Sequence, residues 1–109
     1  MILQKIRNMI NKNRCYCETE INRDQLKRLI DNGAILLDVR SPQEYKEEHL
    51  ENAILLPSYE IKQKASSVLV DKFRTIIVYC STGHRSKKAQ KMLQQMGYEK
   101  VFNLCDGLY

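Results

Sequence analysis

The chain has 109 residues, of which 43% are hydrophobic and 28% charged, a balance typical of one globular domain with a single apolar core. This composition excludes a disordered or fibrous chain. The formal net charge is +5, but residues 1–14 carry four basic side chains and no acidic one, so the rest is nearly neutral and we expect no nucleic-acid partner.

The first 14 residues form a basic segment whose apolar side chains recur at helical spacing. We predict an amphipathic, helical N-terminal extension over residues 1–14, followed by one domain over residues 15–109; attachment of the extension to a membrane surface stays open as an alternative. The sequence has no apolar run long enough to span a bilayer, and its N-terminus lacks the pattern of a secretory signal. We therefore expect no membrane span and a cytoplasmic protein.

Four cysteines are too few and too unevenly spaced for a disulfide framework, which also favours a reducing cytoplasm. Cys15 and Cys17 lie two apart on a predicted edge strand, and we interpret them as small residues beside the core, since a structural zinc needs four ligands. We interpret Cys105 as a packed small residue rather than as a disulfide partner of Cys80. No metal and no cofactor are expected.

The first helix of the domain has recognisable start and stop signals. Asn22 can cap it, with Gln25 three residues later in the capping-box position, and Gly33 marks its end. Residues 34–37 then form a short continuous apolar run, typical of a strand that is covered on both faces.

Asp38 and Arg40 follow that strand at its carboxyl end, the side on which α/β sheets place their ligand crevices. Ser41 and Pro42 can begin the next helix, and Glu44 is spaced to pair with Arg40 across its first turn. We therefore interpret Asp38 and Arg40 as framework residues near the site rather than as catalytic ones.

The alternation of strands and helices continues to the end of the chain. We expect His49 to be a hydrogen-bonded turn residue. The remaining predicted elements are a buried strand over residues 53–56, a loosely helical segment from Ser58, a central strand over 75–79, a helix that stops at Gly97 and a last strand over 101–104. This order predicts an α/β fold with a mostly parallel, five-stranded sheet and helices on both faces.

Cys80 lies where the central strand passes into a helix, and the loop that follows it favours a thiolate. The first N–H groups of a helix have no intrahelical partner, so they can converge on a negative charge. Gly83 permits a tight turn, Ser86 suits the first turn of the helix, and Arg85 adds a cation. Cys80 is therefore expected to be a nucleophile with a low pKa, provided that its loop is open to solvent.

The run Cys80–Ser86 resembles the active-site loop of rhodanese domains, sulfurtransferases that carry sulfane sulfur as a cysteine persulfide. The resemblance extends from about Thr19 to Leu108, because three further segments match in the expected order: Leu37–Tyr45, His49–Pro57 and Val101–Gly107. It implies a rhodanese-like fold and Cys80 as the catalytic nucleophile. It also implies that the substrate is bound by the six residues that follow, Ser81, Thr82, Gly83, His84, Arg85 and Ser86.

The implied activity moves sulfane sulfur from thiosulfate or a low-molecular-weight persulfide to a thiol or to cyanide, through a Cys80 persulfide. The expected partners are a small anionic sulfur donor, a thiol acceptor and, as a further option, a sulfur-relay protein. Two alternatives stay open. One is a non-catalytic binding or sulfur-relay module; the other is phosphatase or arsenate reductase chemistry, whose C-x5-R loops are one residue longer than the C-x4-R spacing from Cys80 to Arg85.

Overall fold

The computed structural model describes residues 19–109. Their elements, in chain order, are β1 (Glu20–Ile21), α2 (Arg23–Asp31), β2 (Ile35–Asp38), α3 (Pro42–Glu47), β3 (Ile54–Leu55), the 3-10 turn η1 (Ser58–Glu60), α4 (Ile61–Val68), β4 (Ile76–Tyr79), α5 (His84–Gln95) and β5 (Val101–Leu104). The predictions for the extension over residues 1–14, for a domain boundary after it, and for Cys15 and Cys17 lie outside the described residues.

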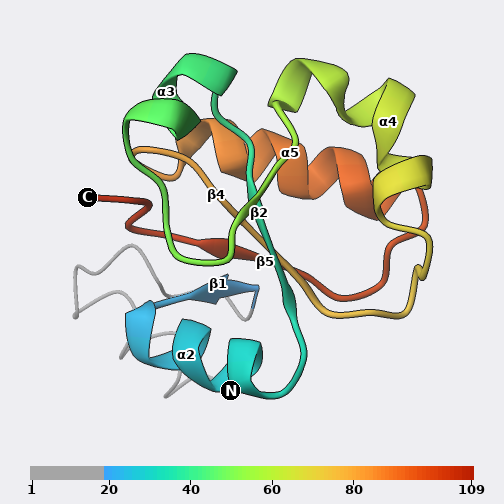
Figure 1. Ribbon diagram of the computed structural model, residues 1–109. Coiled ribbons are helices and arrows are strands. Elements are labelled where there is room, and N and C mark those ends of the chain that lie inside the picture. Colours follow the sequence, from blue (N-terminus) through green and yellow to red (C-terminus); the bar gives the residue numbers. More distant parts are fainter. Residues whose placement is uncertain (1–18) are drawn as a thin grey trace.

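The five strands form one sheet in the order β1-β5-β4-β2-β3, and each neighbouring pair is parallel. The predicted α/β fold with a five-stranded sheet is confirmed, and the sheet is parallel throughout. All carboxyl ends of the strands therefore meet at one edge, where Figure 1 shows the connection from β4 to α5, helix α3 and the C-terminus gathered at the left.

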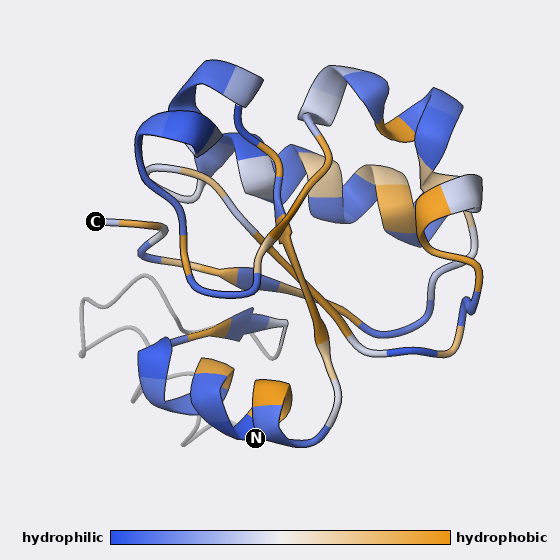
Figure 2. Ribbon diagram, in the orientation of Figure 1, coloured by the Kyte–Doolittle hydropathy of each residue, from blue (hydrophilic) through white to orange (hydrophobic). Residues whose placement is uncertain are grey.

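Strand β4 separates two apolar layers. Ile76 and Val78 belong to the layer beneath α4 and α5, whereas Ile77 and Tyr79 belong to the layer that α2 covers from the other face. This division follows from the alternation of side chains along a strand. All four side chains are fully buried, and Figure 2 shows hydrophobic residues concentrated along the central strands and hydrophilic ones on the outer helix surfaces.

Two predicted helix starts are confirmed by reciprocal side-chain bonds. Asn22 and Gln25 form a capping box at the start of α2, and Ser41 and Glu44 form a second one at the start of α3. Each box satisfies two backbone N–H groups that a helix terminus leaves unpaired. Within the part of the chain that the structure describes, no helix is long and apolar enough to cross a membrane.

Strand β3 differs from its prediction. The run 53–56 was expected to be a buried strand, but Ile54 is 44% exposed. The reason is its place in the sheet, because β3 is an edge strand that pairs only with β2. Hydrophobic residues alone do not distinguish an edge strand from a central one.

Candidate active site

Cys80 directly follows β4, and the loop after it turns into α5 at Gly83. Gly83 has a φ of 95°, a left-handed conformation that side chains other than glycine rarely adopt. A Cβ atom at this position would also overlap the carbonyl oxygen of Cys105. Both constraints require glycine here, and they hold the loop against the segment that follows β5.

The Cys80 sulfur accepts hydrogen bonds from the start of α5. The backbone N–H of Gly83 lies 3.1 Å from Sγ and that of Ser86 lies 3.3 Å away, while the Ser86 hydroxyl oxygen is at 3.4 Å. These donors belong to the N-cap and the third residue of a 12-residue helix, where the helix dipole is positive. The arrangement stabilises negative charge on the sulfur.

The pKa of the Cys80 thiol reflects two opposing effects. Burial raises it, since an apolar environment disfavours the charged form. The hydroxyl of Ser86 and the backbone N–H groups of Ser86, Gly83 and Thr82 lower it, and they outweigh the burial, so the pKa lies below its ordinary value. The thiolate is therefore favoured relative to an unperturbed cysteine.

Cys80 is nevertheless only 1% exposed, so the structure does not meet the condition set for its reactivity, a loop open to solvent. The C-terminal residues contribute to this closure, because the Leu108 N–H donates to the carbonyl oxygen of Cys80 at 2.8 Å and the Tyr109 N–H to that of Ser81 at 3.3 Å. The Arg23 guanidinium in turn donates to the carbonyl oxygens of Gly107 and Leu108. The sulfur thus lies in a closed cradle of donors.

The other loop side chains lie on the surface. Thr82 and His84 are exposed and bond to each other through Oγ1 and Nδ1 at 3.1 Å. Ser81 is half-buried, and its hydroxyl oxygen accepts from Arg85 at 3.3 Å. The structure therefore separates the six residues proposed for substrate binding into Gly83 and Ser86, whose N–H groups lie 3.1 and 3.3 Å from the sulfur, and four whose side chains form the outer rim.

The Arg85 side chain forms an ion pair at the outer rim of the loop. Its two terminal nitrogens donate to the two carboxylate oxygens of Glu44, at 2.7 and 2.9 Å. This pairing raises the pKa of Arg85 and lowers that of Glu44 to about 2. The expected pair between Arg40 and Glu44 is therefore wrong, because Glu44 reaches across to α5.

Arg40 instead forms a buried ion pair with Asp38, in which Nη2 lies 2.7 Å from Oδ2. The Tyr79 hydroxyl donates to the same carboxylate at 2.7 Å and accepts from the Leu50 N–H. Arg40 also donates to the carbonyl oxygen of Glu48. This network joins the ends of β2 and β4 to the segment after α3. This role of Tyr79 was missed from the sequence. A hydroxyl group at the end of an otherwise apolar strand indicates a buried hydrogen bond, and this signal was available.

A second network missed from the sequence anchors the loop to the sheet edge. The Asn103 amide donates to Glu20 at 3.0 Å and to the carbonyl oxygen of Gly83 at 3.3 Å, and Lys87 pairs with Glu20 at 3.3 Å. Asn103 interrupts the apolar run of β5, and this buried polar residue was the available signal. The contacts fix the Gly83 carbonyl beside α5.

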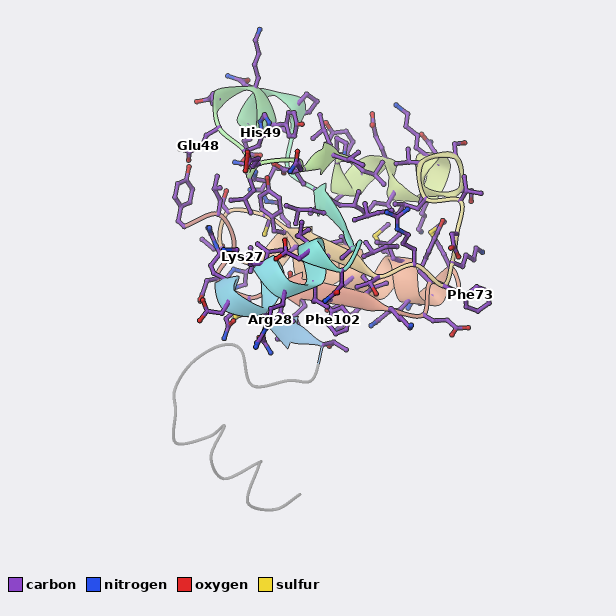
Figure 3. The ribbon with its side chains drawn as sticks, turned by 60° about the horizontal axis from the view of Figure 1, so that its bottom comes forward. Lys27, Arg28, Glu48, His49, Phe73 and Phe102 are labelled. Carbon is purple, nitrogen blue, oxygen red and sulfur yellow. The ribbon has the colours of Figure 1, made fainter. Side chains whose placement is uncertain are left out.

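A cavity of about 100 Å³ lies beside the loop, lined by Arg40, Glu44, Glu47, Glu48, Ser81 and Tyr109. Figure 3 shows Glu48 and His49 together at the end of α3, far from Phe73 at the opposite end of the molecule. His49 donates through Nδ1 to the carbonyl oxygen of Tyr45 at 2.7 Å, and its imidazole stacks on the Tyr45 ring, as expected for a hydrogen-bonded turn residue. A larger hollow of about 450 Å³ lies against α2, and no residue of the Cys80 loop lines it.

Cys105 is disulfide-bonded, so its interpretation as only a packed small residue is wrong. Its partner is not Cys80, whose thiol is free. Over residues 19–109, no three side chains of histidine, cysteine, aspartate or glutamate lie close enough together to hold a metal ion.

Comparisons with known proteins agree with this geometry. A family model described as a rhodanese-like domain matches residues 22–109. The thiosulfate sulfurtransferase PspE of Escherichia coli is 40% identical over 67 residues, which are 62% of this chain and 64% of that protein. A sulfurtransferase of Allochromatium vinosum is 36% identical over 91 residues, which are 82% of this chain and 83% of that protein.

Among solved structures, a rhodanese from Escherichia coli described as containing anions superimposes with a TM-score of 0.64. It shares 37% sequence identity, and the match covers 70% of this chain and 88% of that one. The likeness therefore extends from sequence to backbone over most of the described residues.

Proposed function

Because the chain belongs to the family of rhodanese-like domains, we propose that it is a sulfurtransferase in which Cys80 carries sulfane sulfur as a persulfide. Relatives named as sulfurtransferases support this class of enzyme. The single observation that carries the proposal is the set of donors around Cys80 Sγ, the Gly83 and Ser86 N–H groups at 3.1 and 3.3 Å.

In the first step, the Cys80 thiolate attacks the outer sulfur of thiosulfate or of a low-molecular-weight persulfide. A bond forms between Sγ and that sulfur, and the donor's sulfur–sulfur bond breaks. Its electron pair leaves with sulfite, or with a thiolate when the donor is a persulfide. In the second step, a thiolate or cyanide attacks the outer sulfur of the Cys80 persulfide, and the Cys80 thiolate is released.

Each step passes negative charge through the cradle, from thiolate to persulfide anion and back. We assign the Gly83 and Ser86 N–H groups and the Ser86 hydroxyl to stabilise this charge, as preorganised donors do in an oxyanion hole. Ser81, Thr82, His84 and Arg85 form the rim that a donor meets first. We assign Asp38 and Arg40 to hold the strand ends next to this loop. Both are buried, with exposed fractions of 0% and 2%.

A donor reaches Sγ only when the loop opens, since Cys80 is 1% exposed. We propose that this opening breaks two sets of contacts: the Arg85 pair with Glu44, and the hydrogen bonds of Leu108 and Tyr109 to the loop carbonyls. Openings of this kind occur in many enzymes on a microsecond to millisecond timescale.

The test is thiocyanate formation by the purified full-length chain with thiosulfate and cyanide. We expect turnover by the wild type and none by Cys80→Ser. Persulfide donors are tested in parallel, because activity with these donors alone would keep the enzyme class and change the donor. A Cys80→Ser variant with undiminished turnover would falsify the assigned nucleophile.

One alternative has an observation in its favour. The burial of Cys80 and the occupied Arg85 also suit a non-catalytic module or a sulfur-relay protein. Such a module predicts no thiocyanate with any donor and, in the non-catalytic case, no sulfur on Cys80. Phosphatase or arsenate reductase chemistry predicts release of phosphate from phosphate esters, or reduction of arsenate, which the same protein sample can be tested for directly.

The cytoplasmic location stays a prediction. The disulfide at Cys105 counts against it, because such bonds persist mainly in oxidising compartments. Alkylation of Cys105 in protein trapped directly from cells tests this: labelling of Cys105 without prior reduction supports a reducing compartment, and labelling only after reduction contradicts it.

A further inference from the structure

The Arg85 guanidinium, at the rim of the Cys80 loop, is already paired with the carboxylate of Glu44. Arg85 and Glu44 meet in a bidentate arrangement at 2.7 and 2.9 Å, with side chains 45% and 32% exposed. Planar pairing of this kind uses two parallel N–H bonds of the guanidinium, the same edge that would bind an oxyanion. An anionic donor therefore has to compete with Glu44 for Arg85.

Glu44 is held in this position by its own helix. One carboxylate oxygen accepts from the Ser41 N–H at 3.0 Å and from the Ser41 hydroxyl at 3.1 Å, while the Ser41 hydroxyl accepts from the Glu44 N–H. The hydrogen bond from Arg85 is the main reason why the pKa of Glu44 is near 2, so the carboxylate stays charged at neutral pH. The Glu44 carboxylate therefore stays charged, and available to pair with Arg85, across a modest change of pH.

The surroundings add to the negative charge. The adjoining cavity is lined by Glu44, Glu47 and Glu48, and its one basic residue, Arg40, is engaged by Asp38. A small ion that approaches Ser81 thus meets a cavity lined by three acidic residues, whose one basic residue already has a carboxylate partner. Repulsion grows with the charge of the approaching ion.

We propose that Glu44 is a specificity-determining residue, which lowers reactivity toward doubly charged sulfur donors relative to singly charged ones. The inference rests on the proposed sulfur transfer and deepens it by naming the class of donor. Thiosulfate is a dianion, whereas an alkyl thiosulfonate such as methanethiosulfonate is a monoanion with a comparable sulfur–sulfur bond. With either donor, Sγ binds the outer sulfur, and sulfite or sulfinate leaves with the electron pair.

The experiment measures the rate of Cys80 persulfide formation with both donors and compares their ratio between variants. Glu44→Gln removes the charge but keeps the capping box, for which glutamine is equally suited. We expect the ratio of thiosulfate to methanethiosulfonate reactivity to rise about 3- to 5-fold, the upper end of the scale of an exposed ion pair. Circular dichroism and thermal melting show whether the variant is folded.

The matched control is Glu47→Gln, which removes one charge from the same cavity without touching Arg85. We expect it to change the ratio by less than about 2-fold, as for a single screened surface charge. An unchanged ratio in Glu44→Gln would overturn the inference, and so would an equal rise in Glu47→Gln, because the pair with Arg85 would then not be the cause.

The inference can also be tested on the wild type alone, by measuring how the ratio of the two donor rates depends on ionic strength. Salt weakens interactions between exposed charges, so a repulsive rim predicts that the ratio rises with ionic strength, while a free, attractive Arg85 predicts that it falls. A fall would contradict the inference. If the wild type forms no persulfide with either donor, the sulfur-transfer proposal itself is overturned, whereas persulfide with a ratio insensitive to Glu44 overturns only the assignment of Glu44.

Discussion

At the scale of single residues, the hydroxyl of Ser86 is the most direct influence on the reactive sulfur. It lies 3.4 Å from Sγ and is the largest of the effects that lower the pKa of Cys80. Ser86 is also fully buried, so water does not replace its hydroxyl without rearrangement. Its contribution is therefore measurable in the pH dependence of the reaction.

We predict that Ser86→Ala raises the pKa of Cys80, because it removes the largest of the effects that lower this pKa. Activity rises with pH as the thiolate forms, so the rise moves to higher pH in the variant. The measurement is the pH profile of Cys80 alkylation by iodoacetamide. Thr82→Val is the control, because its hydroxyl contacts His84 and not the sulfur. A profile that stays in place would contradict this role of Ser86.

Gly83 offers a second test at this scale, because the chain contains a matched control. Gly83 and Gly33 both have a φ of 95°, but only at Gly83 would a Cβ overlap another atom, the carbonyl oxygen of Cys105. Gly83→Ala therefore adds a steric conflict to the backbone strain of about 1–3 kcal/mol that both substitutions share. It also displaces an N–H that binds Sγ.

We predict that Gly83→Ala lowers stability by more than Gly33→Ala in urea unfolding, by about 1 kcal/mol or more. Activity with thiosulfate is expected to fall in Gly83→Ala and to persist in Gly33→Ala. Equal losses of stability in the two variants would show that the contact with Cys105 has no energetic consequence.

At the scale of elements, the buried pair of Asp38 and Arg40 joins the end of β2 to β4 and to the segment after α3. Asp38→Ala leaves Arg40 buried without its partner, which we expect to cost about 3–5 kcal/mol of stability. Urea unfolding measures this cost. Glu60→Gln provides the contrast, since its pair with Lys64 is exposed and worth no more than about 0.5 kcal/mol. A loss below about 1 kcal/mol for Asp38→Ala would contradict the framework role.

The elements themselves show what local sequence can and cannot predict. The capping boxes at Asn22 and Ser41 were predictable, because each joins residues three apart. The partner of Arg40 was not: Glu44 was available at helical spacing, but a buried Asp38 that also binds Tyr79 takes its place. Residues that are 41 positions apart, such as Asp38 and Tyr79, meet only in the folded sheet.

At the scale of the whole molecule, the fold followed from the order of short apolar runs and helices, and the sheet places Cys80 at the shared carboxyl edge of its strands. The sequence also indicated the donors around the sulfur, because they come from the loop and helix that follow it. It did not indicate that the sulfur is closed off, since Leu108 and Tyr109 reach the loop only through the completed sheet.

The same long-range packing explains why Glu44 pairs with Arg85 and not with Arg40, the partner predicted from the sequence. Glu44 and Arg85 lie on α3 and α5, which the parallel sheet brings to one edge. Substrate binding by Arg85, the role expected from the resemblance, therefore requires the proposed competition between an anionic donor and Glu44. The fold thus sets the charge that a donor meets at the rim.

The central claim is that Cys80 accepts one sulfur atom and passes it on. The most direct measurement is mass spectrometry of the protein after reaction with a sulfur donor in the absence of acceptor, followed by a thiol or cyanide. We predict a gain of one sulfur atom on the peptide that contains Cys80, and its loss when the acceptor is added. No added sulfur with any donor, or sulfur that stays on Cys80 after the acceptor is added, would contradict the account.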